Sequence, residues 1–343
     1  MSKIAVIGSG SWGISFSRML ANNNHSVCLW SYFEKESADL KKYRENKPFL
    51  PGIILPESIS FTSDMEECVK GAELIVIATP SHTVRQTAKT LAPFVPDGGI
   101  IVNISKGFDC ETLMRLSEVV LSEIPQARVA AMSGPSHAEE VARDLPTTNV
   151  VAHSDLKVSQ YIQDLFMTPN FRIYTSSDII GVELGGSLKN VIALCAGICD
   201  GLGYGDNTKA ALMTRGLAEI MRLGKAMGGQ LETFSGLAGI GDLIVTCTSM
   251  HSRNRRAGIL IGKGKTPEEA QKEVAMVVEG IKATDAAYRL SLKYSVDMPI
   301  TCEAYNLLFK GKSPSDAVRD LMLRSKKSEA ELLELPPVCD DKI

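Results

Sequence analysis

The segment KIAVIGSGSWG, residues 3–13, constrains the fold of this chain more than any other part of the sequence. A short apolar run leads into Gly8, Gly10 and Gly13, which have G-x-G-x-x-G spacing, and a helical pattern follows. With a second strand predicted at 26–31, this unit is typical of a dinucleotide-binding fold. We expect Gly8 to permit a tight turn, Gly10 to let the backbone approach a pyrophosphate, and Gly13 to let helix and strand pack closely. The helix N-terminus would offer free N–H groups to phosphates.

The preference for one dinucleotide over the other stays open at this stage. A site selective for NAD usually has an acidic residue at the end of the second strand, about twenty residues further on. In the segment LWSYFEKE, the residues at that place are Trp30, Ser31 and Tyr32. Glu34 is a candidate for the ribose and Lys35 for a 2′-phosphate, so we predict NAD(P) as cofactor without a preference.

The chain divides into two parts with different patterns. Over residues 1–177, short β-branched runs alternate with helical segments, and several runs are apolar throughout, as in a parallel sheet covered on both faces. We predict an α/β fold, in which a doubly wound, Rossmann-type, mostly parallel sheet forms a dinucleotide-binding domain. Residues 178–330 are predicted to form an all-helical substrate-binding and catalytic domain, and residues 331–343 a flexible tail. The predicted strands cover 3–8, 26–30, 73–79, 99–105, 128–134, 149–154 and 171–175, and the helices of the second part 179–202, 207–227, 268–294, 300–310 and 314–324.

Composition narrows the range of partners. The 343-residue chain has a formal net charge of −3, which argues against a large nucleic-acid-binding surface. We expect no membrane span, because no apolar run approaches the roughly 18 residues that a span needs. We expect no signal peptide either, which favours a cytoplasmic protein. The 8 cysteines lie in apparent strands and helices without a C-x-x-C pair, so reduced thiols and no metal site are predicted.

Three loops follow apolar strands at the edge where open α/β sheets bind ligands. They contain ATPSHTV, NISKGFD and SGPSHAEEVA. Turn chemistry explains Pro80 and Pro135, because proline and serine suit the start of a helix. It does not explain Lys106, which follows an apolar strand and would point toward the cofactor cleft. We therefore predict a functional role for Lys106.

A second lysine stands inside an apolar helical pattern. In GVELGGSLKN, Gly181, Gly185 and Lys189 share one i, i+4 row. Glycine within a helix costs about 1 kcal/mol relative to alanine, so this row needs a reason. Either the glycines open a groove for another molecule beside Lys189, or they permit close helix packing while the lysine extends to solvent.

The segment SMHSRNRRAG favours the first alternative. Ser252, Arg253 and Asn254 stand at the start of a helical run, a combination that suits a phosphate or carboxylate, whereas Arg255 and Arg256 fit a solvated basic patch. A nicotinamide cofactor, a desolvated lysine and an anion site together indicate hydride transfer to a carbon that bears oxygen. A lysine with a lowered pKa would supply the proton, and burial or a nearby cation such as Lys106 would lower that pKa.

At this point the motifs GSGSWG, ATPSHTV, SKGF, SGPSHAEEVA, IGVELGGSLKNVIAL, GLGYGDNTKAALMTRGLAE, GLAGIGDLIVTCTS and SRNRRAG can be taken together. In order and spacing over residues 3 to about 326, they closely resemble bacterial NAD(P)-dependent glycerol-3-phosphate dehydrogenase. The resemblance implies interconversion of sn-glycerol 3-phosphate and dihydroxyacetone phosphate, which feeds phospholipid synthesis.

The resemblance also implies roles for individual residues, with Lys189 as the proton acceptor and Lys106 beside the reacting end. The implied substrate-binding residues are Lys106, Gly134, Ser136, Lys189, Asn190, Asp242, Thr246, Ser252, Arg253 and Asn254. The implied cofactor contacts, added to Gly8, Gly10 and Gly13, are Ser11, Trp12, Tyr32, Lys106, Ala138, Arg253, Val277 and Glu279.

Asp242 would be unremarkable as a mere helix N-cap, and position 32 varies across the family. A homodimer is expected as the partner state, with a small phosphorylated molecule as substrate. The alternatives are a related hydroxyacid-type dehydrogenase with another small anionic substrate, and a dinucleotide-sensing module without catalysis.

Overall fold

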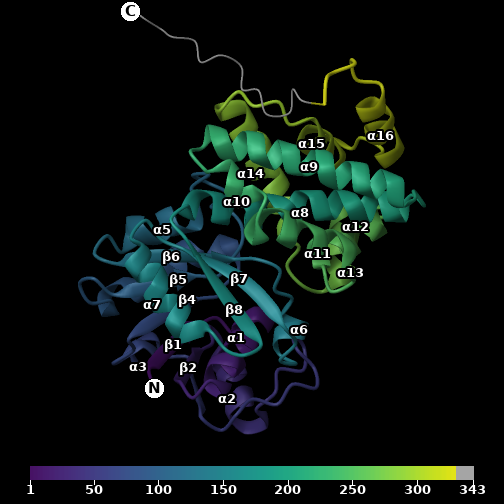
Figure 1. Ribbon diagram of the computed structural model, residues 1–343. Coiled ribbons are helices and arrows are strands. Elements are labelled where there is room, and N and C mark those ends of the chain that lie inside the picture. The colour runs from purple at the N-terminus through teal and green to yellow at the C-terminus, as the bar shows by residue number, and fades with distance from the viewer. Residues whose placement is uncertain (330–343) are drawn as a thin grey trace, which may run out of the picture.

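The computed structural model describes residues 1–329, so the predicted tail, 331–343, lies outside the described residues. A sheet with flanking helices forms the first part of the chain, and a cluster of helices forms the second (Figure 1). The last strand ends at Ser176 and the long helix α8 begins at Ile179, so the two parts join through a very short connection.

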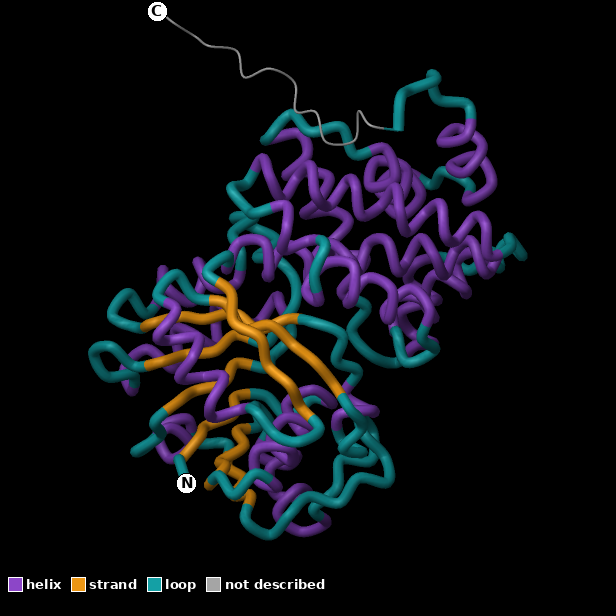
Figure 2. The backbone as a smooth tube through the Cα atoms, in the orientation of Figure 1, coloured by secondary structure: helices purple, strands orange, loops and turns teal. Residues whose placement is uncertain are grey.

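The sheet has eight strands in the order β3-β2-β1-β4-β5-β6-β7-β8. Every neighbouring pair is parallel except β6 and β7, which are antiparallel. Figure 2 shows the strands as one twisted layer confined to the first part of the chain. The predicted doubly wound, mostly parallel sheet is thus confirmed. The strands are β1 (Lys3–Ile7), β2 (Ser26–Trp30), β3 (Ile59–Thr62), β4 (Leu74–Ile77), β5 (Ile100–Asn103), β6 (Arg128–Ser133), β7 (Thr147–Ala152) and β8 (Phe171–Ser176).

Both faces of the sheet are buried because helices cover each of them. Along β1, Ile4 and Val6 pack into a core with α1 and α7, while Ala5 and Ile7 pack into a second core with α4 and α5. This double burial explains why the strand is apolar at every position. The helices of the first part are α1 (Ser11–Asn22), α2 (Glu34–Tyr43), α3 (Met65–Val69), α4 (Val84–Leu91), α5 (Leu116–Glu123), α6 (Ala138–Val141) and α7 (Leu156–Phe166), with short 3₁₀ turns at Ser81–Thr83 and Ala92–Phe94.

Helix α8 is the core of the second part. Its apolar side chains contribute to two clusters, one shared with α9 and α14 and the other with α12 and α13. By length and composition α8 would be able to cross a membrane, but 89% of its apolar window is buried inside the protein. The expectation that no apolar run approaches the length of a span is therefore wrong. The helices are α8 (Ile179–Gly201), α9 (Asp206–Ala226), α10 (Leu231–Phe234), α11 (Asp242–Thr248), α12 (Arg253–Gly262), α13 (Pro267–Val274), α14 (Glu279–Lys293), α15 (Pro299–Lys310) and α16 (Pro314–Met322).

Two sequence predictions of secondary structure are wrong. The pattern at 268–294 predicts one helix, but the chain breaks after Val274, where Ala275 adopts a left-handed conformation with φ 55°. The new helix must start close to α8, because a Cβ on Gly280 would lie 2.7 Å from the Asn190 carbonyl oxygen. Strand β3 is not predicted at all, because a four-residue edge strand with an exposed Ser60 gives little apolar pattern.

Candidate active site

A cleft of about 1200 Å³ lies where the carboxyl ends of the strands meet the helical part. Most of the residues that the sequence singles out line it, although they come from segments far apart in the chain. Four predicted residues do not line it, namely Gly13, Gly134, Ala138 and Asp242. The predicted residues that do are Gly8, Gly10, Ser11, Trp12, Tyr32, Lys106, Ser136, Lys189, Asn190, Thr246, Ser252, Arg253, Asn254, Val277 and Glu279.

The glycine loop has the geometry that a bound pyrophosphate needs. Gly8 has φ 120°, a backbone conformation that other residues rarely adopt. A Cβ on Gly13 would lie 1.9 Å from the Gly8 carbonyl oxygen, whereas one on Gly10 would meet nothing within 4 Å. The open space before Gly10 leaves room for a phosphate at the N-terminus of α1. Thr79 lines the same cleft, and its buried Oγ1 has no hydrogen-bond partner among the described residues. These residues fit a dinucleotide, and the roles predicted for the three glycines agree with this geometry.

Lys189 is buried in the cleft wall, with 5% of its surface exposed. Its ammonium group donates to the Asp242 carboxylate and, at 2.8 Å, to Thr246 Oγ1. Burial lowers the pKa of Lys189 to about 7; Asp242 opposes this shift and the nearby Lys106 adds to it. Such a lysine exchanges its proton near neutral pH, as a general acid–base group must.

The glycine row on α8 serves helix packing, and the predicted groove for another molecule is wrong. A Cβ on Gly185 would lie 2.3 Å from the Ala238 carbonyl oxygen, so protein backbone fills the space beside it. The segment that packs there, Leu237–Gly241, is a π-helical turn where the sequence suggested a glycine loop. This turn leads directly into Asp242 and places its carboxylate on Lys189. The lysine does not extend to solvent, so neither of the two predicted alternatives is right in full.

Asp242 joins the two lysines. Its Oδ2 accepts a hydrogen bond from Lys106 at 2.6 Å, and its other oxygen accepts from Lys189. Lys106 also donates to the Gly134 carbonyl oxygen at 3.0 Å. Burial raises the pKa of Asp242, but the two ammonium groups outweigh burial and hold it below its usual value. Asp242 stays ionised and holds both lysine side chains in place, while Lys189 remains able to lose a proton.

An anion-binding corner lies beside the lysines, at the start of α12. Ser252 caps the helix through its Oγ, which accepts from the Arg255 N–H at 3.2 Å. Asn254 donates to Asn190 Oδ1 at 2.9 Å and so ties the corner to α8. Arg253 lines the cleft, and its guanidinium makes no hydrogen bond or ion pair among the described residues. Burial lowers its pKa, although Glu279 favours its charge. A partly desolvated guanidinium without an acidic partner suits a phosphate.

The comparisons with known proteins agree with this geometry. A model of the NAD-dependent glycerol-3-phosphate dehydrogenase N-terminus matches residues 3–159, and a model of the C-terminus of the same enzyme matches residues 178–319. The chain belongs to the NAD-dependent glycerol-3-phosphate dehydrogenase family. The sequence resemblance is thereby confirmed, together with the predictions of an oxidoreductase and of NAD(P).

Individual relatives of this family match almost the whole chain. It is 57% identical over 334 residues to glycerol-3-phosphate dehydrogenase [NAD(P)+] of Agathobacter rectalis, covering 97% of this chain and 99% of that one. It is 55% identical to the enzyme of the same name from Moorella thermoacetica, covering 96% and 98%. The crystal structure of glycerol-3-phosphate dehydrogenase from Coxiella burnetii matches with a TM-score of 0.91 at 37% identity, covering 94% and 99%.

Several predicted family residues also make contacts that hold the protein together. Gly134 holds Lys106 through its carbonyl group, and the carbonyl of Ala138 accepts from Ser15 Oγ at 2.7 Å. Glu279, at the start of α14, accepts from the N–H and Oγ of Ser81 at 3.2 and 2.6 Å. This contact joins the helical part to the loop after β4 at the mouth of the cleft.

Sequence reasoning missed other residues of the cleft. His137 and His251 line it, with ring centroids 5.8 Å apart. Both stand in motifs quoted above, SGPSHAEEVA and SMHSRNRRAG, but nothing local distinguishes a cleft histidine from a surface one. Arg255 is also misjudged as solvated, because its guanidinium pairs with Asp200 at 2.8 Å. Among the described residues there is no group of three potential metal ligands, and the seven cysteines are free.

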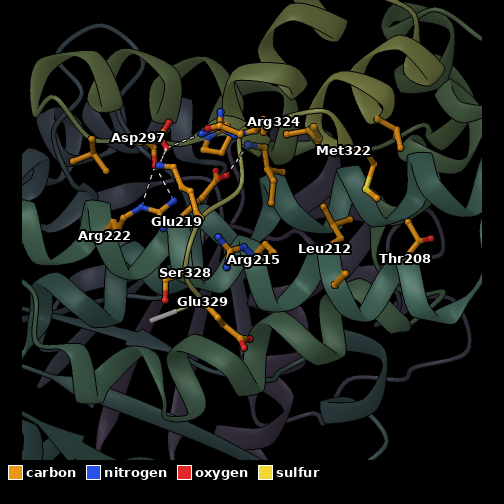
Figure 3. Close-up of a pocket in the computed structure, with 18 of the residues that line it drawn as sticks. Thr208, Leu212, Arg215, Glu219, Arg222, Asp297, Met322, Arg324, Ser328 and Glu329 are labelled. Carbon is orange, nitrogen blue, oxygen red and sulfur yellow. Dashed lines mark hydrogen bonds and ion pairs between the residues drawn. The ribbon is translucent and has the colours of Figure 1, made fainter. Parts of the chain in front are cut away.

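A second cavity, of about 1350 Å³, lies between α9, α16 and the turn before α15 (Figure 3). None of the predicted family residues lines it. Several of its charged side chains contact Asp297: Arg324 and Lys327 contact the Asp297 carboxylate at 2.9 and 3.5 Å, and Arg222 donates to the Asp297 carbonyl oxygen at 2.8 Å. Glu219 also lines the cavity, and it accepts the Ile300 N–H at 2.6 Å.

Proposed function

We propose that this chain interconverts sn-glycerol 3-phosphate and dihydroxyacetone phosphate with NAD(P), and that Lys189 is its general acid–base group. The observation that carries the proposal is the position of Lys189, buried in the cleft beside Asp242 and Thr246 with a pKa of about 7. When bound, the nicotinamide supplies the hydride or, in the reverse direction, accepts it.

The proton steps follow from the contacts of Lys189. In the reduction, its ammonium group donates a proton to the carbonyl oxygen of the substrate, which becomes the hydroxyl group. In the oxidation, the neutral amine removes that proton. Asp242 keeps the side chain in place, and Lys106, which shares that carboxylate, would contact the same substrate oxygen. Two cations beside one oxygen stabilise the negative charge that develops on it.

The phosphate of the substrate would bind at the anion-binding corner. Arg253 offers an unpaired guanidinium there, and the start of α12 adds backbone N–H groups. Because Asn254 contacts Asn190, the residue next to Lys189 in the chain, the corner and the proton donor are held at a fixed separation. A short substrate with a phosphate at one end and a carbonyl near the other would span that separation.

One assay tests this proposal against the alternatives. We expect NAD(P)H oxidation with dihydroxyacetone phosphate and none with 2-oxo carboxylates of similar size. Activity with the carboxylates alone would favour the hydroxyacid-type dehydrogenase. Cofactor binding without turnover on either class would favour the sensing module.

Other properties remain predictions and have their own tests. We propose a role in phospholipid synthesis, a cytoplasmic location and a homodimer. Cell fractionation and sedimentation of the purified chain would check the last two. We also propose that 1–177 and 178–330 behave as separate domains, which limited proteolysis would test.

A further inference from the structure

The end of the cleft near β2 and α2, where the adenosine of a dinucleotide would bind, lies apart from the end that contains Lys189. Tyr32 and Phe33 line it and are 72% and 65% exposed. Ser31, directly after β2, is fully buried, and its Oγ has no partner among the described residues. None of the residues at the usual place of the selective acid is acidic: Trp30 and Tyr32 line the cleft, and Ser31 does not. The discrimination between NADH and NADPH must come from another residue.

Glu36, on the first turn of α2, lines this end of the cleft, whereas Glu34 does not. The buried Asn46 donates from its Nδ2 to Glu36 Oε1 at 2.9 Å and to the Ser9 carbonyl oxygen at 3.3 Å. Ser9 lies within the glycine loop, so one amide links the carboxylate to the loop that receives the dinucleotide. Glu36 Oε2 makes no hydrogen bond among the described residues and is left to accept one from a ligand.

We propose that Glu36 is the selectivity residue for the adenosine ribose, and that Asn46 positions it, so that the chain binds NADH in preference to NADPH. The carboxylate would accept a hydrogen bond from the 2′-hydroxyl of NADH. It would repel the 2′-phosphate of NADPH, since like charges at close range oppose binding. This inference refines the NAD(P) activity proposed above.

The charges around Glu36 support this preference. Asp39 and Glu45 also line this end of the cleft, and Lys35 is the one basic side chain that lines it there among the described residues. Lys35 is exposed and makes no hydrogen bond or ion pair in the described part of the chain. Glu45 is paired with Lys47 at 4.0 Å, whereas Glu36 and Asp39 make no ion pair among the described residues. Two unpaired carboxylates against one unanchored ammonium disfavour a phosphate. Holding that lysine on a phosphate would also cost side-chain entropy.

Direct binding measurements test the proposal without requiring turnover. The dissociation constants of NADH and NADPH would be measured by fluorescence titration in the absence of substrate. We expect the unmodified protein to bind NADH at least about tenfold more tightly, and Glu36→Gln to narrow that ratio about tenfold, chiefly by tightening NADPH. Asn46→Ala keeps the Glu36 carboxylate but removes the hydrogen bond that positions it. We therefore expect a smaller decrease of the same affinity ratio.

Glu34→Gln is the matched control, because it removes a carboxylate from the first turn of the same helix that does not line the cleft. It should leave the ratio within about twofold. Equal affinity of the unmodified protein for both dinucleotides would overturn the proposal. An unchanged affinity ratio in Glu36→Gln would also overturn it. A loss of NADPH affinity in Lys35→Ala, without any change in Glu36→Gln, would overturn it as well. If the selectivity holds but dihydroxyacetone phosphate is not reduced, the proposed reaction fails while this inference stands.

Discussion

Two buried carboxylates, Asp242 and Glu219, are equally hidden from solvent and behave in opposite ways. Each is 1% exposed. Asp242 receives two ammonium groups from different parts of the chain, and its pKa is held below the usual value despite burial. Glu219 receives backbone N–H groups at the start of α15, and burial raises its pKa to about 7, although those donors oppose the rise. At Asp242 two ammonium groups outweigh desolvation, whereas at Glu219 the backbone dipoles do not. Burial of a carboxylate therefore does not by itself identify an active site. Here the site is identified by the two lysine ammonium groups that share Asp242.

Lys189→Ala should give the largest effect on activity. Removal of a general acid–base group lowers turnover by at least about a hundredfold. The measurement is kcat for dihydroxyacetone phosphate, with fluorescence titration of the dinucleotide as the control. Dinucleotide binding should persist, because the glycine loop is in another part of the chain. Near-normal turnover with intact binding would contradict the proposed role.

Arg253→Ala should mainly weaken substrate binding. Loss of a charge-assisted contact of about 1.5–3 kcal/mol raises the KM for the phosphorylated substrate by roughly ten- to a hundredfold. Free glycerol lacks the phosphate, so its slow oxidation should hardly change. Arg255→Ala serves as comparison, since Arg255 is already paired with Asp200 and should affect stability more than KM. Equal losses for both substrates would argue against the phosphate contact.

The pH dependence of the two directions should be opposite. Because the pKa of Lys189 is lowered to about 7, its protonated form is lost above that pH. The kcat/KM for reduction should fall as pH rises through about 7, by up to tenfold per pH unit, and that for oxidation should rise. Asp242→Asn removes a charge that raises the pKa of Lys189, so both limbs should move to lower pH. If the pH profiles of Asp242→Asn are the same as those of the unmodified protein, Asp242 does not influence the proton transfer by Lys189.

Glu219→Gln should have the smallest effect on activity, below about twofold, because no cleft residue contacts Glu219. Its effect should be on stability. Since the pKa of Glu219 rises from 4.5 to about 7 on folding, the folded state retains a proton over that interval. The unmodified protein should therefore lose stability relative to Glu219→Gln as pH rises from about 5 through 7. Urea unfolding at several pH values would measure this, and a loss of turnover would show that the two carboxylates are less distinct than proposed.

Much of the fold and part of the site are predictable from local sequence. Apolar runs such as that of β1 predict a sheet buried on both faces, and the spacing of Gly8, Gly10 and Gly13 predicts the turn, the open approach and the helix contact. The residue run beginning at Ser252 predicts an anion site at the start of a helix. These features depend on periodicity and on neighbouring residues, which a single sequence records.

Features that depend on contacts between distant segments are not predictable in this way. The helix break after Val274 follows from packing against α8, and the pattern of its own residues gives no warning of it. Asp242 lies 53 residues from Lys189 along the chain, and Asn46 lies 37 from Ser9. No spacing rule connects such pairs.

The sequence by itself determined that a sheet-based dinucleotide site would precede a helical part, and that two lysines and an arginine needed a functional reason. It did so because periodicity, glycine conformation and proline or serine at helix starts are local properties. Only the tertiary structure decided that Asp242 would hold both lysines, that burial would lower the pKa of Lys189, and that Glu36 would face the glycine loop. Desolvation and charge pairing depend on distances through space, and the packing of α8 against the π-helical turn sets the distance between Lys189 and Asp242.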